Sequence, residues 1–268
     1  MAVIGSKVVN VDVSLSVVTF NNSGIIKKLL NNIIDVFSNK VLFRVYVIDN
    51  GSTDGTVNIC KKISMVNPEV QIIESVQNKG FGSGHNSILP LLDSKYHIIL
   101  NPDISIESFT EIQKILDFMN LHEEVGLLSP LILNEDGSIQ RLYKLQPTVL
   151  DLAIRFISPN FLKKRQKKFV RLDTGYDKIG PIDYASGCFM FFRTNILKKI
   201  SGFDEKYFMY MEDADITRKV NDISRAVFFP CAKVTHTWMR ESHKKIKYVL
   251  ITLKSMWIYF NKWGWKFY

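Results

Sequence analysis

The stretch Val47-Ile-Asp-Asn-Gly-Ser-Thr-Asp-Gly55 runs from the end of an apolar segment into a cluster of turn-forming residues. The apolar segment, Phe43 to Ile48, has the length and composition of a buried β-strand, and the Asp, Asn and Gly residues after it are typical of a loop. Three other segments repeat this order of apolar strand and polar loop: Val13 to Thr19, Val70 to Glu74 and His97 to Leu100. The first half of the chain is therefore expected to contain four strands that each end in a polar loop.

A helical segment separates the first two of these strands. Apolar residues recur at helical spacing through Ile25, Leu29, Leu30 and Ile33, and Ser23 stands where it can cap the helix. Strands that alternate with helices predict an α/β fold with a mainly parallel sheet, in which ligands collect beyond the carboxyl ends of the strands. Each polar loop falls at such an end.

The pattern is less regular in the second half of the chain. We expect a strand over Val125 to Leu133, a turn at Asn134 to Gly137 and an exposed basic segment at Lys163 to Lys168. Regular structure is expected again at Tyr184 to Phe192, and Met211 to Asp215 opens a predicted helix. No internal repeat is visible.

Composition limits the partners and the compartment. The 268 residues carry a formal net charge of +9, which fits a partner with phosphates, whether nucleic acid, an anionic lipid or a diphosphate-linked substrate. Cys60, Cys188 and Cys231 form no CxxC pair, which favours a reducing cytoplasm. Residues 1–13 lack the pattern of a signal peptide, and no apolar run reaches the roughly 20 residues that cross a bilayer.

The loops after the first two strands carry hydrogen-bond acceptors suited to a nucleoside. They are Thr19-Phe-Asn21 and Asp49-Asn-Gly-Ser-Thr-Asp54. Asp49 can accept the ring N–H of uracil or thymine, which stands between two carbonyl groups. The alternative is that Asp49 and Ser52 only build a turn.

A third loop, Asn78-Lys-Gly-Phe-Gly-Ser-Gly-His-Asn86, is rich in glycine. Glycines let the backbone approach a ligand, and the following helix can present its N-terminus to a phosphate. The GxGxG spacing after the third strand differs from a dinucleotide-binding fingerprint. A plain glycine-rich loop is the alternative, and His85 is expected to be structural.

Two acidic motifs follow. Asp103 ends Leu100-Asn-Pro-Asp103 and can supply one ligand to a Mg²⁺ ion that takes its other ligands from phosphates and water, or it can cap a helix before Ile104. Glu212-Asp-Ala-Asp215 can hold a general base for a hydroxyl proton, for which we select Asp213. The alternative is that these acids complement the dipole of the helix they begin.

These motifs, in this order, resemble glycosyltransferase family 2 and most of all its bacterial rhamnosyltransferase-like branch. The resemblance extends from about Val13 to His236. It rests on Val17-Val-Thr-Phe-Asn21, Val47 to Gly55, Asn78-Lys-Gly-Phe-Gly82 with Asn86, Leu100-Asn-Pro-Asp103, Ser186-Gly187, Gly202-Phe-Asp-Glu205 and Tyr210-Met-Glu-Asp-Ala-Asp215. It implies a GT-A fold, a nucleoside-diphosphate-sugar donor and a single displacement that inverts the anomeric carbon.

The resemblance also implies roles for individual residues. Binding of the sugar donor is expected from Thr19, Asn21, Asp49, Asn50, Asn78, Gly80, Asn86 and Asn101. Asp213 matches the proposed base, and Glu212 and Asp215 are expected to shape the acceptor site.

A divalent cofactor, Mg²⁺ or Mn²⁺, is part of the same expectation. Asp103 matches the metal-binding final acid of the family's DxD motif, although Asn101 replaces the usual first Asp. His236 resembles the family's late histidine, which can approach the metal or the diphosphate, but Met239 replaces the glycine expected three residues later. A structural histidine is the alternative. Arg240 can neutralise a leaving diphosphate or simply lie on the surface.

We divide the chain accordingly. Residues 1–240 are the expected GT-A domain, with a nucleotide-sugar half over about 10–121 and an acceptor half over about 122–240. Residues 241–268 form a basic, aromatic-rich amphipathic tail. Such a helix suits contact with a membrane surface through residues 243–268, and a core-packing helix or a homodimer contact is the alternative.

The expected reaction moves L-rhamnose from dTDP-L-rhamnose to a lipid-diphosphate-linked or polysaccharide acceptor, as in O-antigen or capsule synthesis. UDP-hexoses and galactofuranose donors are the alternatives, and the enzyme is expected on the cytoplasmic face of the inner membrane. A nucleotidyltransferase lacks support because no triphosphate loop follows Thr19. A noncatalytic nucleotide- or nucleic-acid-binding protein would explain the charge, but the lysines concentrate in the middle and the tail, so we expect no nucleic-acid partner.

Overall fold

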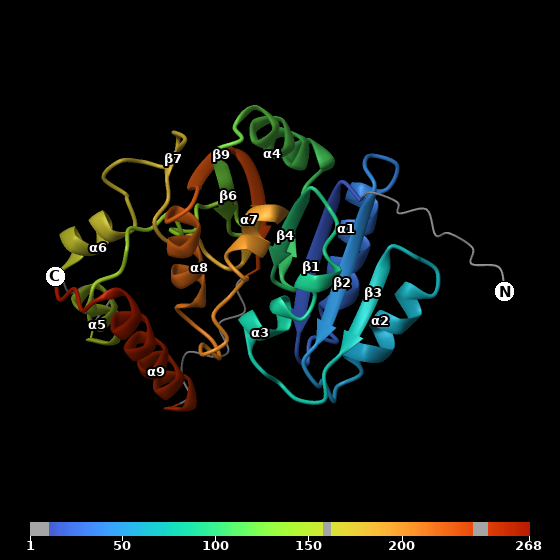
Figure 1. The fold of residues 1–268 in the computed structure, drawn as a ribbon, viewed down its shortest axis with the longest axis horizontal. Coiled ribbons are helices and arrows are strands. Elements are labelled where there is room, and N and C mark those ends of the chain that lie inside the picture. The colour runs from blue at the N-terminus through green and yellow to red at the C-terminus, as the bar shows by residue number, and fades with distance from the viewer. Residues whose placement is uncertain (1–10, 158–161, 238–245) are drawn as a thin grey trace.

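One mixed sheet of nine strands runs through the computed structural model, which describes residues 11–157, 162–237 and 246–268 (Figure 1). The strand order is β3-β2-β1-β4-β8-β6-β9-β5, and β7 pairs with β9. The strands are β1 (Val13–Thr19), β2 (Phe43–Asp49), β3 (Val70–Glu74), β4 (Tyr96–Leu100), β5 (Ile104–Ser105), β6 (Val125–Leu133), β7 (Gly180–Pro181), β8 (Phe189–Arg193) and β9 (Arg225–His236). The helices are α1 (Ile26–Phe37), α2 (Thr56–Ser64), α3 (Phe81–Asn86), the short 3-10 helix η1 (Leu89–Leu91), α4 (Phe109–Leu121), α5 (Val149–Ile157), α6 (Lys163–Phe169), α7 (Thr194–Lys199), α8 (Glu212–Asn221) and α9 (Ile246–Trp263).

The first four long strands are parallel, as the alternating sequence pattern predicts. Thr19 lies opposite Asp49, and Asp49 lies opposite Glu74, so β1, β2 and β3 end together. Leu100 at the end of β4 lies opposite Val17 of β1. The loops that follow these strands therefore meet at one edge of the sheet, which is where ligands bind in such folds.

The second half of the chain extends the same sheet. β8 pairs antiparallel with β4 on one side and with β6 on the other, and β6 runs parallel to β9. The predicted strand Val125 to Leu133 is confirmed. In the segment expected to be regular from Tyr184, the strand begins only at Phe189, and the residues before it form a loop. That loop crosses the edge of the sheet at which the polar loops gather.

Helices cover both faces of the sheet (Figure 1). Apolar residues of α1, α2 and α4 pack on one face, which includes Leu15, Val17 and Val47. Residues of α7 and α8 pack on the opposite face, which includes Ile99 and Phe192. Helices on both faces explain why β1 and β4 are buried almost throughout.

Polar residues are nevertheless buried on the second face, in a connected chain. Ser14 Oγ lies 2.7 Å from His97 Nδ1, and Ser16 Oγ lies 2.8 Å from His97 Nε2 and 2.7 Å from His85 Nδ1. Burial lowers the pKa of His97 to about 3, and burial together with His97 lowers the pKa of His85 well below its ordinary value. Both histidines are therefore neutral and structural at physiological pH, as expected for His85.

The helix cap predicted at Ser23 is absent, and so is the alternative cap at Asp103. Helix α1 begins at Ile26 after a turn in which the Ile25 and Ile26 N–H groups bond the Asn22 carbonyl, and no side chain caps it. The Ser23 N–H instead donates to Asp54 Oδ2 in the loop after β2. Asp103 precedes the short strand β5 rather than a helix, which removes the capping alternative for Asp103.

The C-terminal tail forms α9 and packs on the protein. Met256, Tyr259 and Phe260 are buried against a third apolar group that includes Tyr207 and Met211. Residues 266 and 267 accept hydrogen bonds from the start of α5. In residues 11–157, 162–237 and 246–268, no helix is long and apolar enough to cross a membrane.

Candidate active site

Asp49 lies at the carboxyl end of β2 with its two carboxylate oxygens in different situations. Oδ2 accepts hydrogen bonds from the N–H groups of Gly51 at 3.0 Å and Ser52 at 2.8 Å. Oδ1 is buried and has no hydrogen-bond partner. The predicted turn is therefore present, and it uses one oxygen only. A buried acceptor without a partner is costly, so Oδ1 is suited to a ligand N–H.

Asn21 joins the loop after β1 to the loop after β2. Its backbone adopts a positive φ of 56°, its N–H donates to Ser52 Oγ at 2.8 Å, and its Oδ1 accepts from the Thr53 N–H at 2.8 Å. Thr19 is buried and donates to Asn22 Oδ1 at 2.9 Å. Thr19 and Asn21 thus shape the surface beside Asp49 chiefly through contacts within the two loops.

Asn50 and Asn78 build the third loop. Asn50 Nδ2 donates to Asn78 Oδ1 at 3.3 Å and to the Gly80 carbonyl at 3.1 Å, while Asn78 Oδ1 accepts from the Gly80 N–H at 2.9 Å. Gly80 has φ +96°, and a Cβ there would lie 2.2 Å from the Phe208 carbonyl oxygen. The Phe81 N–H donates to that same carbonyl. The Gly80 and Phe81 N–H groups at the start of α3 are thus used within the protein rather than turned toward a phosphate.

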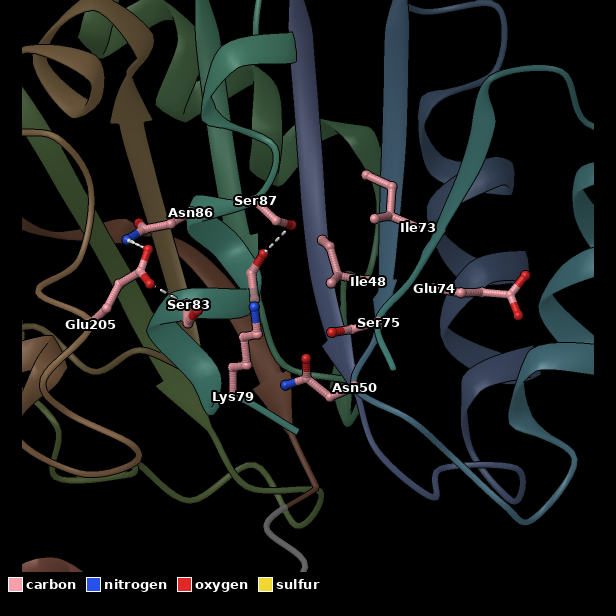
Figure 2. Close-up of a pocket in the computed structure, with 11 residues that line it drawn as sticks. Ile48, Asn50, Ile73, Glu74, Ser75, Lys79, Ser83, Asn86, Ser87 and Glu205 are labelled. Carbon is pink, nitrogen blue, oxygen red and sulfur yellow. Dashed lines mark hydrogen bonds between the residues drawn. The ribbon is translucent and has the colours of Figure 1, made fainter. Parts of the chain in front are cut away.

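Asn86, at the end of α3, holds the segment Gly202 to Glu205. Its Oδ1 accepts from the Phe203 N–H, and its Nδ2 donates to the Phe203 carbonyl at 2.9 Å and to Glu205 Oε1 at 3.1 Å. Figure 2 shows Asn86 and Ser83 both directed toward Glu205. The structure therefore places Asn86 as a link between two loops of the site.

A cavity of about 300 Å³ lies beside this third loop, between α3 and the ends of β2 and β3 (Figure 2). Side chains alternate between the faces of a strand, so Ile48 in its wall and Asp49 point to opposite faces. The cavity is lined by Ile48, Asn50, Ile73, Glu74, Ser75, Lys79, Ser83, Gly84, Asn86, Ser87 and Glu205.

Asp103 and His236 face each other at the end of the sheet. His236 Nε2 lies 3.2 Å from Asp103 Oδ1, which is buried and accepts no hydrogen bond. Gln140 fixes the imidazole tautomer: its Nε2 donates to Asn134 Oδ1 and to the His236 carbonyl, which leaves Gln140 Oε1 to accept from His236 Nδ1 at 2.9 Å. Nδ1 therefore carries a proton, and Nε2 is the ring nitrogen directed at Asp103, where a metal ion can bind it.

This pair fits a divalent cation. Two ligands that bind one octahedral ion at right angles over about 2.1 Å lie about 3.0 Å apart, close to the observed separation. The hydrogen bond from His236 to Gln140 is the support that metal-bound histidines commonly have. Among the described residues, no group of three or more His, Cys, Asp or Glu side chains gathers in this way. Asp103 and His236 would thus leave most coordination positions to substrate and water.

Asn101 and Cys188 connect this pair to the second acidic motif. The Asn101 N–H donates to the Cys188 carbonyl at 2.9 Å, and the Gly187 N–H donates to Asp213 Oδ2 at 3.3 Å. Burial, together with the charges of Asp103 and Asp213, raises the pKa of the Cys188 thiol to about 12. The loop before β8 therefore lies between Asp103 and Asp213, and its thiol stays protonated rather than acting as a nucleophile.

Asp213 stands in the first turn of α8 and is half-buried. Glu212 beside it is buried, and its Oε2 has no hydrogen-bond partner. Burial and the neighbouring charge of Asp213 raise the pKa of the Glu212 carboxyl well above its ordinary value. Burial therefore favours the neutral form of Glu212, so Glu212 adds no second negative charge beside Asp213.

Asp215, two residues further on, is completely buried under α9. Trp263 Nε1 donates to its Oδ1 at 2.7 Å, and Lys262 Nζ donates to its Oδ2 at 3.0 Å. The structure thus gives Asp215 partners in the C-terminal helix. Gln140, Lys262 and Trp263 were absent from the sequence-based site, because each meets its partner across 47 or more residues and no local motif marks it. Arg240 lies outside the described residues.

Solved structures share this architecture. A mannosyltransferase from Pyrobaculum calidifontis, in complex with GDP-Man and Mn²⁺, superposes with a TM-score of 0.63 at 16% identity over 87% of this chain and 59% of its own. Staphylococcus aureus TarS, residues 1–349, gives a TM-score of 0.60 at 19% identity over 84% of this chain and 60% of its own. At these identities the likeness establishes the fold, which is the expected GT-A fold.

Two curated relatives are rhamnosyltransferases. The N-acetylglucosaminyl-diphospho-decaprenol L-rhamnosyltransferase of Mycobacterium tuberculosis is 27% identical over 206 residues, which is 72% of this chain and 66% of the relative. Rhamnosyltransferase WbbL of Escherichia coli K12 is 23% identical over 220 residues, 78% of this chain and 76% of the relative. The chain thus matches just under two thirds of the mycobacterial relatives' length.

A family model described as "Glycosyl transferase family 2" matches residues 14–201, more than two thirds of the chain. The match begins at β1 and runs past Asp49, the glycine-rich loop, Asp103 and the Gly187 loop. The ordered motifs, the fold and the similarity to rhamnosyltransferases agree with it. The chain belongs to glycosyl transferase family 2.

Proposed function

We propose that the chain is an inverting glycosyltransferase that moves a sugar from a nucleoside diphosphate to an acceptor hydroxyl. The observation that carries this proposal is the position of the loop before β8. This loop adjoins both the Asp103–His236 pair and the Asp213 carboxylate. A single displacement needs stabilisation of the leaving diphosphate and a general base for the acceptor hydroxyl. A site with a diphosphate on one side and a general base on the other provides both.

The proposed sugar donor is dTDP-L-rhamnose. The similarity to two rhamnosyltransferases favours the sugar. The free Oδ1 of Asp49 favours a nucleobase with a ring N–H, which thymine, uracil and guanine have and cytosine lacks. UDP-hexoses and galactofuranose donors are the alternatives within this class. Residues of about 10–121 are the proposed half for the sugar donor, and residues of about 122–240 the proposed half for the acceptor.

The mechanism follows from the chain's own groups. Asp213 removes the proton of the acceptor hydroxyl, whose oxygen bonds to the anomeric carbon as the bond from that carbon to the diphosphate oxygen breaks. The attack comes from the face opposite the leaving group, so the configuration inverts without a covalent enzyme intermediate. Glu212, held neutral, keeps a second negative charge away from Asp213.

A divalent ion is the proposed cofactor. Asp103 and His236 would hold Mg²⁺ or Mn²⁺, and the ion would neutralise charge that develops on the diphosphate. Asn101 occupies the position of the family's first acid, and its uncharged side chain would lie toward the donor rather than add a charged ligand. Mn²⁺ accompanies GDP-Man in the mannosyltransferase of similar fold.

The proposed acceptor is a lipid-diphosphate-linked or polysaccharide glycan at the cytoplasmic face of the membrane. The mycobacterial relative is named for a diphospho-decaprenol acceptor. On α9, an exposed apolar row spaced three or four residues apart faces away from the protein; its members are Ile246, Leu250, Leu253 and Trp257. Residues 246–268 contain four lysines and no acidic residue.

Basic and apolar groups together suit an anionic bilayer better than a second copy of a chain with net charge +9. The four exposed lysines of α6 add to this charge: Lys163, Lys164, Lys167 and Lys168. We therefore commit to peripheral contact through α9. The rest of the proposed contact, residues 243–245, lies outside the described residues.

Binding measurements test the sugar donor and the metal. Purified protein would be titrated with dTDP-, UDP-, CDP- and GDP-sugars, each with and without Mg²⁺ or Mn²⁺. We expect dTDP- or UDP-sugars to bind at least about tenfold more tightly than CDP-sugars, which lack the ring N–H, and the metal to strengthen binding. Equal binding of all four bases, or binding of none, would contradict the assignment.

Vesicle sedimentation tests the membrane contact. Wild-type protein and a Leu250→Ser/Trp257→Ser double variant would be mixed with phosphatidylglycerol or phosphatidylcholine vesicles. The wild type should sediment with the anionic vesicles only, and the variant should stay in solution. If the wild type binds neither kind of vesicle but forms a dimer that the variant does not form, the exposed apolar row of α9 is a contact between copies. The membrane proposal then fails.

A further inference from the structure

Asp215 has a complete set of partners that the proposed chemistry does not explain. The carboxylate is fully buried, Lys262 Nζ lies 2.9 Å from Oδ1 and 3.0 Å from Oδ2, and Trp263 Nε1 lies 2.7 Å from Oδ1. Tyr207 Oη is 3.4 Å from Oδ1. A buried carboxylate is stable only when paired and hydrogen-bonded, so α9 supplies the positive charge that this position in α8 requires.

Lys262 binds two elements at once. Its ammonium also lies 3.0 Å from Asp204 Oδ2, in the segment that Asn86 holds at the other end of the site. Burial works against the charge on Lys262, but the hydrogen bonds to Asp215 and Asp204 outweigh it and raise the pKa of the ammonium group. Trp263 is held on its other side, where the Arg218 guanidinium lies 4.4 Å from its ring.

The turn that leads into α8 needs such support. Tyr210 and Met211, the two residues before the helix, have φ values of 70° and 67°, a region that residues with side chains rarely adopt. Two such residues in succession cost free energy and persist only where their surroundings hold them. Helix α9 contacts both sides of this turn: Ser255 Oγ donates to the Met209 carbonyl at 2.8 Å, and Met211 packs with Phe260.

We propose that Lys262 and Trp263 are positioning residues that hold the first turn of α8, and with it Asp213, through their contacts with Asp215. Asp213 and Asp215 lie in the same turn of one short helix, so a displacement at Asp215 moves Asp213 relative to the Gly187 N–H. The C-terminal helix is then part of the catalytic apparatus although it does not touch the reacting atoms. This inference rests on the proposed role of Asp213 as the base.

The test compares kcat with KM in three variants of Lys262 and Trp263. Lys262→Met removes the charge and keeps much of the side-chain volume, Lys262→Arg restores the charge, and Trp263→Phe removes the indole N–H. Misplacement of a reacting group by about 1 Å can lower a rate by about 100-fold. We expect Lys262→Met to lower kcat by about 10- to 100-fold with the KM for the sugar donor within about twofold of wild type. Lys262→Arg should recover most of kcat.

Amide hydrogen exchange gives a second readout that does not depend on turnover. Residues 209–215 should exchange faster in Lys262→Met and in Trp263→Phe, whereas residues 49–55 should be unchanged. Lys199→Met, which removes an exposed lysine at the end of α7, is the matched control and should behave as wild type in both measurements. If Lys262→Met proves too unstable to purify, Trp263→Phe carries the test, with a decrease of about three- to tenfold in kcat expected.

Two results would overturn the inference. One is wild-type kcat in both Lys262→Met and Trp263→Phe, and the other is an equal loss in kcat and in sugar-donor affinity with uniform acceleration of exchange. Asp213→Asn separates this failure from failure of the proposed function. An inactive Asp213→Asn beside an active Lys262→Met rejects the positioning role alone, whereas an active Asp213→Asn rejects the assignment of the base.

Discussion

At the scale of single residues, the site depends on carboxylates whose two oxygens have different surroundings. Asp49 uses Oδ2 to hold its own loop and keeps Oδ1 buried without a partner. Asp103 has a buried Oδ1 that lies 3.2 Å from His236 Nε2. Loop N–H groups hold Asp49, and Gln140 holds the histidine that faces Asp103, so each carboxylate keeps one buried oxygen available for a ligand.

Replacing Asp49 tests this division directly. In Asp49→Asn one acceptor oxygen becomes an NH₂ group, so either the turn loses its acceptor or the ligand meets a hydrogen-bond donor. A hydrogen bond to a charged group contributes about 1.5–3 kcal/mol, so we expect affinity for dTDP or UDP to fall by about 10- to 100-fold. Calorimetric titration with dTDP measures this, and unchanged affinity would show that Oδ1 does not receive the base.

Glu212 gives a prediction about pH. A carboxyl whose pKa is raised in the folded state stabilises the protein at low pH, and this contribution is lost as the pH rises from the ordinary value of 4.5 through the raised pKa. Glu212→Gln removes the ionisable group. The free energy of unfolding of the wild type should therefore fall relative to that of the variant above about pH 5, by at most about 1.4 kcal/mol per pH unit. Urea denaturation at pH 5 to 8 measures both free energies of unfolding. A constant difference between wild type and Glu212→Gln over this range would contradict the prediction.

The sequence identified some of these residues and could not identify others. Asp49, Asp103 and Asp213 stand at a strand end or a helix start, where their neighbours in the chain mark them. Gln140 and Lys262 have no such mark. Their partners, His236 and Asp215, come from distant segments, and only the folded chain brings them together.

At the scale of elements, the loop between β3 and α3 illustrates how a glycine is required by geometry. Gly80 combines φ +96° with an approach so close that a Cβ would lie 2.2 Å from the Phe208 carbonyl oxygen. The same carbonyl accepts the Phe81 N–H. The glycine pattern in the sequence predicted that this backbone approaches a ligand, whereas at Gly80 the structure shows an approach to another loop of the protein.

Substituting Gly80 should therefore be more harmful than substituting a glycine that has only an unusual φ. Gly137 has φ +78°, and a Cβ placed there would have nothing within 4 Å, so Gly137→Ala measures the backbone cost by itself. Gly80→Ala must also displace the loop that contains Phe208. We expect this variant to lose at least about 2 kcal/mol more free energy of unfolding than Gly137→Ala. Urea denaturation of both variants checks this. Equal losses of stability would mean that the loop that contains Phe208 adjusts freely.

The helices and strands were predictable to different degrees. Four parallel strands followed from apolar runs with polar ends, and β6 from its apolar composition. The late start of β8 was not evident, because Tyr184 to Phe192 is largely apolar apart from Ser186 and Gly187, while only its second part pairs with β4 and β6. The start of α1 was misjudged because Asp54, from another loop, binds the Ser23 N–H.

At the scale of the whole molecule, one sheet serves both proposed halves of the enzyme. β8 pairs with β4 on one side and with β6 on the other, so the loop before β8, which touches Asp213, and the loop after β4, which carries Asp103, are fixed by neighbouring strands. Helix α9 then closes over α8 from outside the sheet (Figure 1). The sequence indicates that the tail is amphipathic. It does not indicate which side packs on the protein, because the buried side and the exposed side both contain aromatic residues.

The buried histidines make the whole fold sensitive to acid. His97 and His85 have lowered pKa values in the folded state, so the unfolded chain binds more protons as the pH falls below about 6.5. Stability should therefore decrease from about pH 6.5 toward pH 3, and His97→Gln should make this decrease shallower by up to about 1.4 kcal/mol per pH unit. Thermal unfolding at pH 4.5 to 7 tests the comparison, and an unchanged slope in the variant would contradict it.

The proposed function rests above all on Asp213 acting as the general base in an inverting transfer of a sugar from a nucleotide at this edge of the sheet. The direct measurement is transfer by wild type and Asp213→Asn, with the tightest-binding nucleotide sugar, Mn²⁺ and a polyprenyl-diphosphate-linked glycan, followed by NMR of the product's anomeric configuration. We predict inversion, and at least about a 100-fold lower rate in Asp213→Asn with unchanged nucleotide affinity. Retention of configuration, or transfer by Asp213→Asn at the wild-type rate, would contradict this assignment.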